Sequence, residues 1–102
     1  MNCDLIMRRA AGLIEQGKVE ECFTFLHSHL ATYRGQKNIG GVGTILCALA
    51  ELHVEAGDPG GARPLLMELL AIECDDLLEV EQSRGRELLM QIGDTTGGDA
   101  LG

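Results

Sequence analysis

The sequence is poor in aromatic residues and lacks the alternation of apolar and polar residues that marks a half-buried strand. Phe23, Phe25 and Tyr33 are its only phenylalanine and tyrosine residues, and it has no tryptophan. The core must therefore be built from Leu, Ile, Val, Ala and Met, which suits packed helices. Because β-branched and aromatic residues favour strands, their scarcity indicates an all-α fold. The length of the chain allows one domain.

Basic residues are also scarce, with 8 against 16 acidic residues and a formal net charge of -8. Phosphate backbones repel such a molecule, so nucleic acid is excluded as an expected partner. The charge is uneven, because residues 51–102 hold 3 basic and 12 acidic side chains. This half would attract a basic or amphipathic partner, although an acidic surface also simply favours solubility.

The four cysteines, at positions 3, 22, 47 and 74, form no closely spaced pair. Scattered cysteines within apolar stretches indicate reduced thiols in a core rather than disulfides or zinc ligands. No stretch approaches the roughly 20 apolar residues of a membrane span, and the first residues lack the apolar segment of a secretory signal. These absences predict a cytoplasmic protein with no membrane partner.

Apolar residues recur at helical spacing in four segments separated by turn residues, and a fifth segment, 77–92, has its apolar residues at the two ends and a polar middle. The predicted helices are 4–16, 19–33, 42–56, 61–73 and 77–92, with Gly17 and Gly57 as stops at positive φ. The glycine-rich segment 35–41 is expected to be a loop. Pro64 requires either that the fourth helix has it in the first turn or that the helix bends there. We expect one helical domain over 1–93 and a disordered tail over 94–102.

The chain contains an internal repeat. Superimposing Gly17-Lys18 on Gly57-Asp58 aligns two helix-turn-helix units that are 40 residues apart. After each turn a small residue stands at the same offset, Cys22 in one unit and Ala62 in the other. A leucine follows four positions later in both. A repeat of this kind predicts stacked antiparallel helical hairpins.

The repeat resembles the tetratricopeptide family. The second unit carries the better match and the first the looser one, with Arg9 and His29 where the family has apolar or small residues. The matching positions are Leu46, Leu49, Ala50, His53, Gly57-Asp58, Ala62, Leu66 and Leu69, and then Ile6, Ala10, Leu13, Gly17, Cys22 and Leu26. The resemblance covers 4–73 and makes 77–92 a capping helix.

Two departures from the family pattern keep an unrelated helical bundle as the alternative. The period of 40 exceeds the family's period of about 34 residues. We expect the excess to lie in the loop 35–41. Neither unit ends in the family's characteristic proline.

Catalytic and metal-binding patterns are weak. His27 and His29 are two apart on a helix and point away from each other, so they cannot share an ion. His53 and Cys47 have no third group that would make them a catalytic pair. The glycines of 40–44 lack the strand and the Gly-Lys-Ser/Thr ending of a phosphate-binding loop. We therefore expect no enzyme activity, metal, cofactor or small-molecule substrate.

The resemblance implies a protein-binding module, because tetratricopeptide proteins are scaffolds and chaperones that hold segments of other proteins. The helices 4–16 and 42–56 would line its groove. By analogy, a small acidic member resembles the chaperones of secretion systems, such as type III export. Repeat arrays need about three units to bury their cores. A structural homo-oligomer that covers the same face with a second copy is therefore the alternative.

The candidate contact residues come from the apolar faces of the first three predicted helices. Met7 and Phe25 lie off the main apolar stripes, so each either meets a partner or fills space beside another helix. The full set is Ile6, Met7, Leu13, Phe25, Leu46, Leu49 and His53.

Overall fold

A computed structural model of the chain describes the backbone of residues 3–74 and 76–101 and the side chains of residues 4–74 and 76–92. Within this part of the chain there are five helices and no strand. The helices are α1 (Cys3–Glu15), α2 (Val19–Gly35), α3 (Ile39–Glu55), α4 (Pro59–Ala71) and α5 (Glu79–Leu101). The predicted all-α fold is confirmed.

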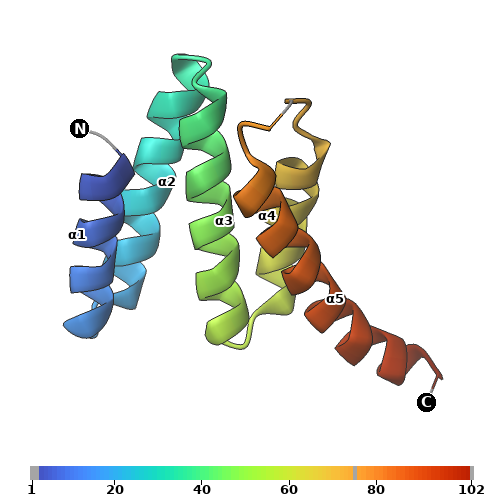
Figure 1. Cartoon of the computed structure of the whole chain (residues 1–102). Coiled ribbons are helices and arrows are strands. Elements are labelled where there is room, and N and C mark those ends of the chain that lie inside the picture. Colours follow the sequence, from blue (N-terminus) through green and yellow to red (C-terminus); the bar gives the residue numbers. More distant parts are fainter. Residues whose placement is uncertain (1–2, 75, 102) are drawn as a thin grey trace.

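The helices form two antiparallel hairpins, α1 with α2 and α3 with α4, and α5 packs against the second hairpin (Figure 1). Helix α3 contacts all four other helices, whereas α1, among the described residues, contacts only α2 and α3. Because the chain reverses at each turn, α1 and α3 run in the same direction. The order of contacts agrees with the predicted arrangement of hairpins followed by a further helix.

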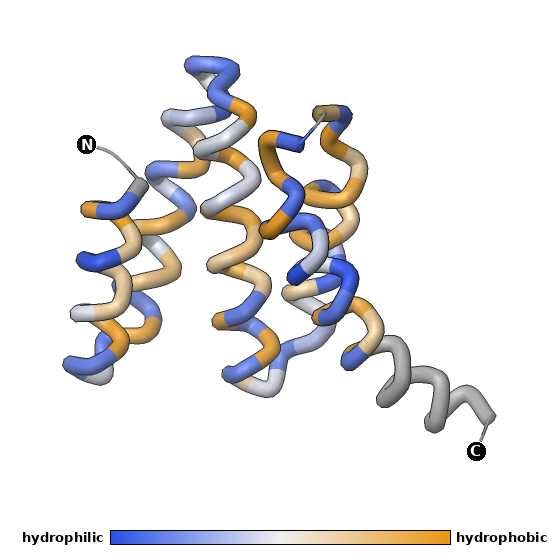
Figure 2. Tube along the Cα trace, in the orientation of Figure 1, coloured by the Kyte–Doolittle hydropathy of each residue, from blue (hydrophilic) through white to orange (hydrophobic). Residues whose placement is uncertain are grey.

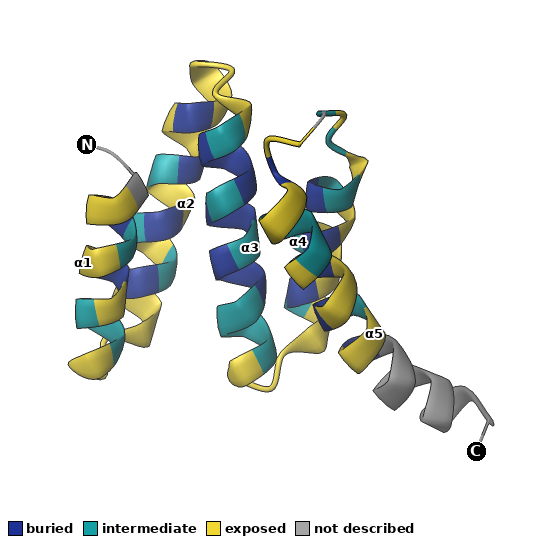
Figure 3. Cartoon of the chain, in the orientation of Figure 1, coloured by how far each residue is buried: buried dark blue, intermediate teal, exposed yellow. Residues whose placement is uncertain are grey.

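Apolar residues concentrate along α3 (Figure 2), and most residues of α3 are buried or half-buried (Figure 3). One buried cluster joins α1, α2 and α3 and includes Ile6, Leu26 and Leu46. A second joins α3, α4 and α5 around Leu66 and Leu88. Since α3 contributes to both clusters, it connects the two halves of the core. Among the described side chains, no buried polar atom lacks a hydrogen-bond partner.

Three turns of the same geometry follow α1, α2 and α3 at intervals of 20 residues. Gly17 and Gly57 have φ of 76° and 78°, as predicted, and Lys37 takes the same left-handed conformation with φ of 56°. In each turn this residue's N–H donates to the carbonyl three residues back, and the next N–H donates to the carbonyl five back, at 2.8–3.1 Å. This pattern is the Schellman motif that ends helices.

Two of these turns also begin the next helix with a side-chain cap. Asn38 accepts a hydrogen bond from the Gly41 N–H at 3.0 Å, and Asp58 accepts one from Gly61 at 3.1 Å. Lys18 occupies the corresponding place before α2 and makes no such bond. The 20-residue unit of one helix and one turn therefore recurs in structure more regularly than in sequence.

The predicted loop over 35–41 is wrong. Helix α2 extends to Gly35 and α3 begins at Ile39, so only 36–38 connect them. Gly41 and Gly43 lie within α3 and are buried. They allow close packing: a Cβ on Gly41 would be 2.6 Å from the Tyr33 ring, and one on Gly43 would overlap Leu78. The excess over the family period therefore lies in the two 17-residue helices, α2 and α3.

Helix α4 starts at Pro59 and holds Pro64 in its second turn, which excludes the first of the two alternatives for this proline, a place in the first turn. At the other end of α4, the Gln82 amide on α5 donates to the carbonyls of Leu69 and Ile72 at 3.1 and 3.0 Å. The Leu69 carbonyl also accepts from the Ile72 N–H at 3.3 Å, so both carbonyls at this helix end have hydrogen-bond partners. The bonds from Gln82 also fix α5 against α4.

Helix α5 begins at Glu79, two residues later than predicted, and its described side chains end at Ile92. The expected disordered tail over 94–102 lies outside the described side chains and stays a prediction. Across the described residues, no helix combines the length and the hydropathy needed to cross a bilayer.

Candidate partner-binding groove

A groove of about 360 Å³ runs between α1 and α3. Most of the lining residues come from α1 and α3, and they are spaced alike on the two helices. Met7, Ala11 and Ile14 line it from α1, and Ala48, Leu52 and Glu55 line it from α3. Both sets repeat at intervals of four and then three residues, which places each set on one helix face. The lining residues are Met7, Ala10, Ala11, Ile14, Glu15, Leu26, Ala48, Glu51, Leu52 and Glu55.

The floor of the groove is apolar and consists of two alanines and a leucine. Ala10, Ala48 and the α2 residue Leu26 are buried there, with exposed fractions of 4%, 7% and 0%. Met7, Ile14 and Leu52 are half-buried, and Ala11 is exposed. Alanines let the two helices leave room between them, and the larger side chains on either side give that room apolar walls. A bulky apolar side chain from outside fits such a cavity.

The edge of the groove is acidic. Glu15, Glu51 and Glu55 line it, and Arg84 of α5 donates to Glu51 across a distance of 2.5 Å. The same guanidinium reaches Glu87 at 3.1 Å. Glu15 and Glu55 make no ion pair within the described part of the chain. The groove therefore combines apolar walls with two carboxylates whose charge the described protein leaves uncompensated.

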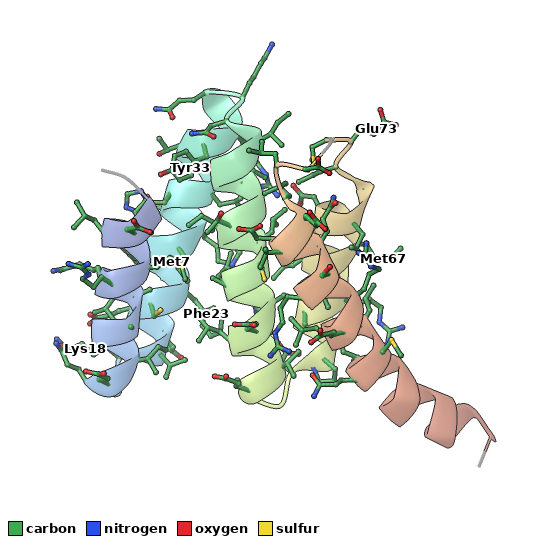
Figure 4. All side chains as sticks on the ribbon, viewed as in Figure 1. Met7, Lys18, Phe23, Tyr33, Met67 and Glu73 are labelled. Atoms are coloured by element: carbon green, nitrogen blue, oxygen red, sulfur yellow. The ribbon has the colours of Figure 1, made fainter. Side chains whose placement is uncertain are left out.

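Of the predicted contact residues, only Met7 lines this groove (Figure 4). Ile6, Leu46 and Leu49 have exposed fractions of 0% and belong to the core. A partner has no access to these three side chains, because they are fully buried. Leu46 and Leu49 are buried because α3 is covered from several sides, and Ile6 of α1 packs into the same cluster.

The other three predicted residues, Leu13, Phe25 and His53, lie outside the groove. Leu13 lines a smaller polar pocket of about 210 Å³, which also contains Arg9 and Lys18. The Phe25 ring is half-buried and meets His29 edge-on, with ring centroids 4.7 Å apart. None of the three lines the groove between α1 and α3.

His53 takes part in a contact between three helices. Its ring lies against Phe23 of α2, with centroids 4.6 Å apart, and its Nδ1 is 3.1 Å from the Asp58 carboxylate. Because Asp58 also caps α4, His53 links the end of α3 to α2 and to the start of α4. This geometry is that of a structural contact.

The described cysteines are free thiols. Cys22 is buried, and its thiol donates to the Ala10 carbonyl at 3.5 Å, while Cys47 and Cys74 are half-buried. Burial, with the nearby charges of Glu51 and Glu81, raises the pKa of Cys47 to about 11. Such a thiol stays protonated and unreactive at neutral pH. Within the described residues, no three His, Cys, Asp or Glu side chains are placed to hold a metal ion.

Sequence reasoning identified the two helices of the groove and missed most of the face that forms it. Ala11, Ile14, Ala48 and Leu52 were absent from the predicted set, as were the three glutamates. The signal that finds them is the shared spacing of small and apolar residues on the two helices. That signal becomes readable once the side of α3 covered by α2 and α4 is known.

No protein-family model, curated protein or solved structure matches the chain.

Proposed function

We propose that this protein is a tetratricopeptide-like binding module that holds an apolar or amphipathic segment of another protein, as a chaperone or adaptor does. The observation that carries the proposal is the groove between α1 and α3, with its alanine floor and apolar walls. Helix α3 contacts both helices of the first hairpin, its own partner α4 and also α5. Stacked helical hairpins are expected to make such contacts.

The groove suits a polypeptide because the side chains that line it offer contact surface and no reacting group. An amphipathic segment binds such a surface through apolar side chains at successive helical turns. Met7, Ala11 and Ile14 span two turns of α1, which is enough length for a short apolar stretch. The acidic edge favours a segment that carries positive charge.

A structural homo-oligomer is the second candidate, and a different surface supports it. Large apolar side chains are exposed on α4, on α5 and on the segment between them. They include Met67 at 58%, Leu77 at 65%, Val80 at 78% and Met90 at 67%. Figure 4 shows Met67 on α4. Exposed apolar side chains of this size occur at interfaces. A second copy covering them would leave the groove between α1 and α3 open.

Photocrosslinking from the groove tests the proposed function. A photoreactive amino acid at Ala11, on the exposed part of the groove, is expected to crosslink to another protein in cells of the source organism. The same amino acid at Ala31, which is exposed on α2 outside the groove, is the matched control. Mass spectrometry then identifies the crosslinked protein and the peptide that carries the link.

The outcomes separate the two candidates. A crosslink to a different protein from position 11 and not from position 31 supports the binding module. A crosslink to a second copy of the chain, together with a dimer mass in sedimentation, supports the homo-oligomer. Equal crosslinking from both positions contradicts the groove as the binding surface.

A further inference from the structure

One end of the groove between α1 and α3 carries negative charge. Glu15 is the last residue of α1 and Glu55 is the last residue of α3. The two helices run in the same direction (Figure 1), and both glutamates line the groove. The two carboxylates therefore lie at one end of it, beyond the apolar walls.

The helix backbones add to this negative charge. The carboxyl end of each helix carries the equivalent of roughly half a unit of negative charge, which makes a glutamate there unfavourable. Helix α1 has no basic residue in its last turn that would offset the charge. Neither Glu15 nor Glu55 makes an ion pair within the described residues. A cation from a partner would relieve this repulsion.

The third carboxylate of the groove is already occupied. Arg84 reaches Glu51 at 2.5 Å, so a guanidinium is seated at the edge of the groove in the free protein. The hydrogen bonds to Glu51 and Glu87 raise the pKa of Arg84. Charge compensation at Glu51 leaves Glu15 and Glu55 as the acceptors open to a second basic group. The groove thus has a compensated side and an uncompensated end.

We propose that the groove binds a segment of another protein in which a large apolar side chain is accompanied by an arginine or lysine. The apolar side chain lies over Ala11 and Ala48, and the basic side chain meets Glu15 and Glu55. This inference rests on the proposed function and specifies the partner's chemistry. A second copy of the chain is a poorer occupant, because two molecules of net charge -8 repel each other.

Selection from a phage-displayed library of random short peptides tests the inference on the full chain. The baits are wild type, Ala11→Trp, which fills the groove, and the double variant Glu15→Gln/Glu55→Gln. The double variant Glu20→Gln/Glu21→Gln is the matched control, because it makes the same charge change on exposed residues at the start of α2. A peptide selected on wild type is then synthesised and its affinity is measured against every bait.

Peptides enriched on wild type are expected to combine large apolar residues with neighbouring arginine or lysine. The synthesised peptide should bind Glu15→Gln/Glu55→Gln about tenfold more weakly, from the loss of two ion pairs at the groove edge. It should bind the control variant within about twofold of wild type. In the absence of peptide, Glu15→Gln/Glu55→Gln should melt at a higher temperature than wild type, because it removes the repulsion at the two helix ends.

Apolar peptides without a basic preference, or equal affinity for both double variants, overturn the inference and leave the proposed function standing. No enrichment on wild type over Ala11→Trp overturns the proposed function together with the inference. A gain in melting temperature without a loss of affinity also overturns the inference, because the glutamates would then act only on stability.

Discussion

Gly41 lies directly against the ring of Tyr33, where α3 begins and α2 ends. A Cβ at position 41 would be 2.6 Å from the ring Cγ and 2.7 Å from both Cδ atoms. Tyr33 is buried, with an exposed fraction of 8%, so its ring has little room to move. The absence of a side chain at Gly41 therefore sets how closely the two hairpins pack.

Gly41→Ala is expected to destabilise the protein by about 1–3 kcal/mol through overpacking. Gly12→Ala is the control, because a Cβ on Gly12 meets nothing within 4 Å and alanine favours a helix. Thermal unfolding should show a lower melting temperature for the first variant and a higher one for the second. A Gly41→Ala protein as stable as wild type would show that Tyr33 adapts and that the contact does not limit packing.

Lys37 adopts a backbone conformation that is unfavourable for a residue with a side chain, whereas the two equivalent turns have glycine at this position. Its φ of 56° lies in the left-handed region, which costs a non-glycine residue roughly 1–2 kcal/mol. Lys37→Gly relieves this cost and loses part of the gain through the greater freedom of glycine in the unfolded chain. We expect a net stabilisation of about 0.5–1 kcal/mol in denaturant unfolding.

Gln36→Gly is the control for Lys37→Gly. Gln36 has φ of -85°, so glycine there brings the entropic cost without relief of strain. It should lower stability. If both glycine variants change stability by the same amount and sign, the third turn is not equivalent to those at Gly17 and Gly57.

The sequence predicts the first four helices well because each has a clear apolar period, and it predicts two of the three turns because glycine marks them. It misses the third turn because Lys37 stands where glycine is expected. The glycines at 35, 40 and 41 suggest a loop, because glycine serves both loops and close helix packing. For Gly41, only its neighbour in the fold, Tyr33, distinguishes the two uses.

The groove was harder to predict than the helices. The apolar faces of α1 and α3 contain both core and groove residues, and a single sequence does not separate them. Leu46 and Leu49 look like contact residues until α3 is seen to be covered by its neighbours. Ala11 and Ala48 look unremarkable because their role is to leave space.

Cys47 is expected to react slowly with iodoacetamide in the native protein. With a pKa of about 11 instead of 9.0, its thiolate fraction at pH 8 is about a hundredfold smaller. Its alkylation rate, followed by peptide mass spectrometry, should keep rising with pH toward 11. In the denatured protein it should level off near pH 9. A native rate equal to the denatured rate at pH 8 would contradict the burial of this thiol.

The raised pKa of Cys47 also makes the stability of the protein depend on pH. The folded state holds the thiol proton more tightly than the unfolded state, so this contribution to stability is complete below about pH 9. It is lost as the pH rises toward 11. A Cys47→Ser variant should lose less stability than wild type over that range of pH.

If the groove between α1 and α3 binds another protein, a bulky side chain inside it must block that binding, and calorimetric titration measures the loss. The titrant is the protein crosslinked from position 11, and the variants are Ala11→Trp and Ala31→Trp. Both positions are exposed, so both variants should fold like wild type. We expect Ala11→Trp to abolish measurable binding and Ala31→Trp to bind as wild type does. Wild-type affinity for a folded Ala11→Trp protein would show that the partner binds elsewhere.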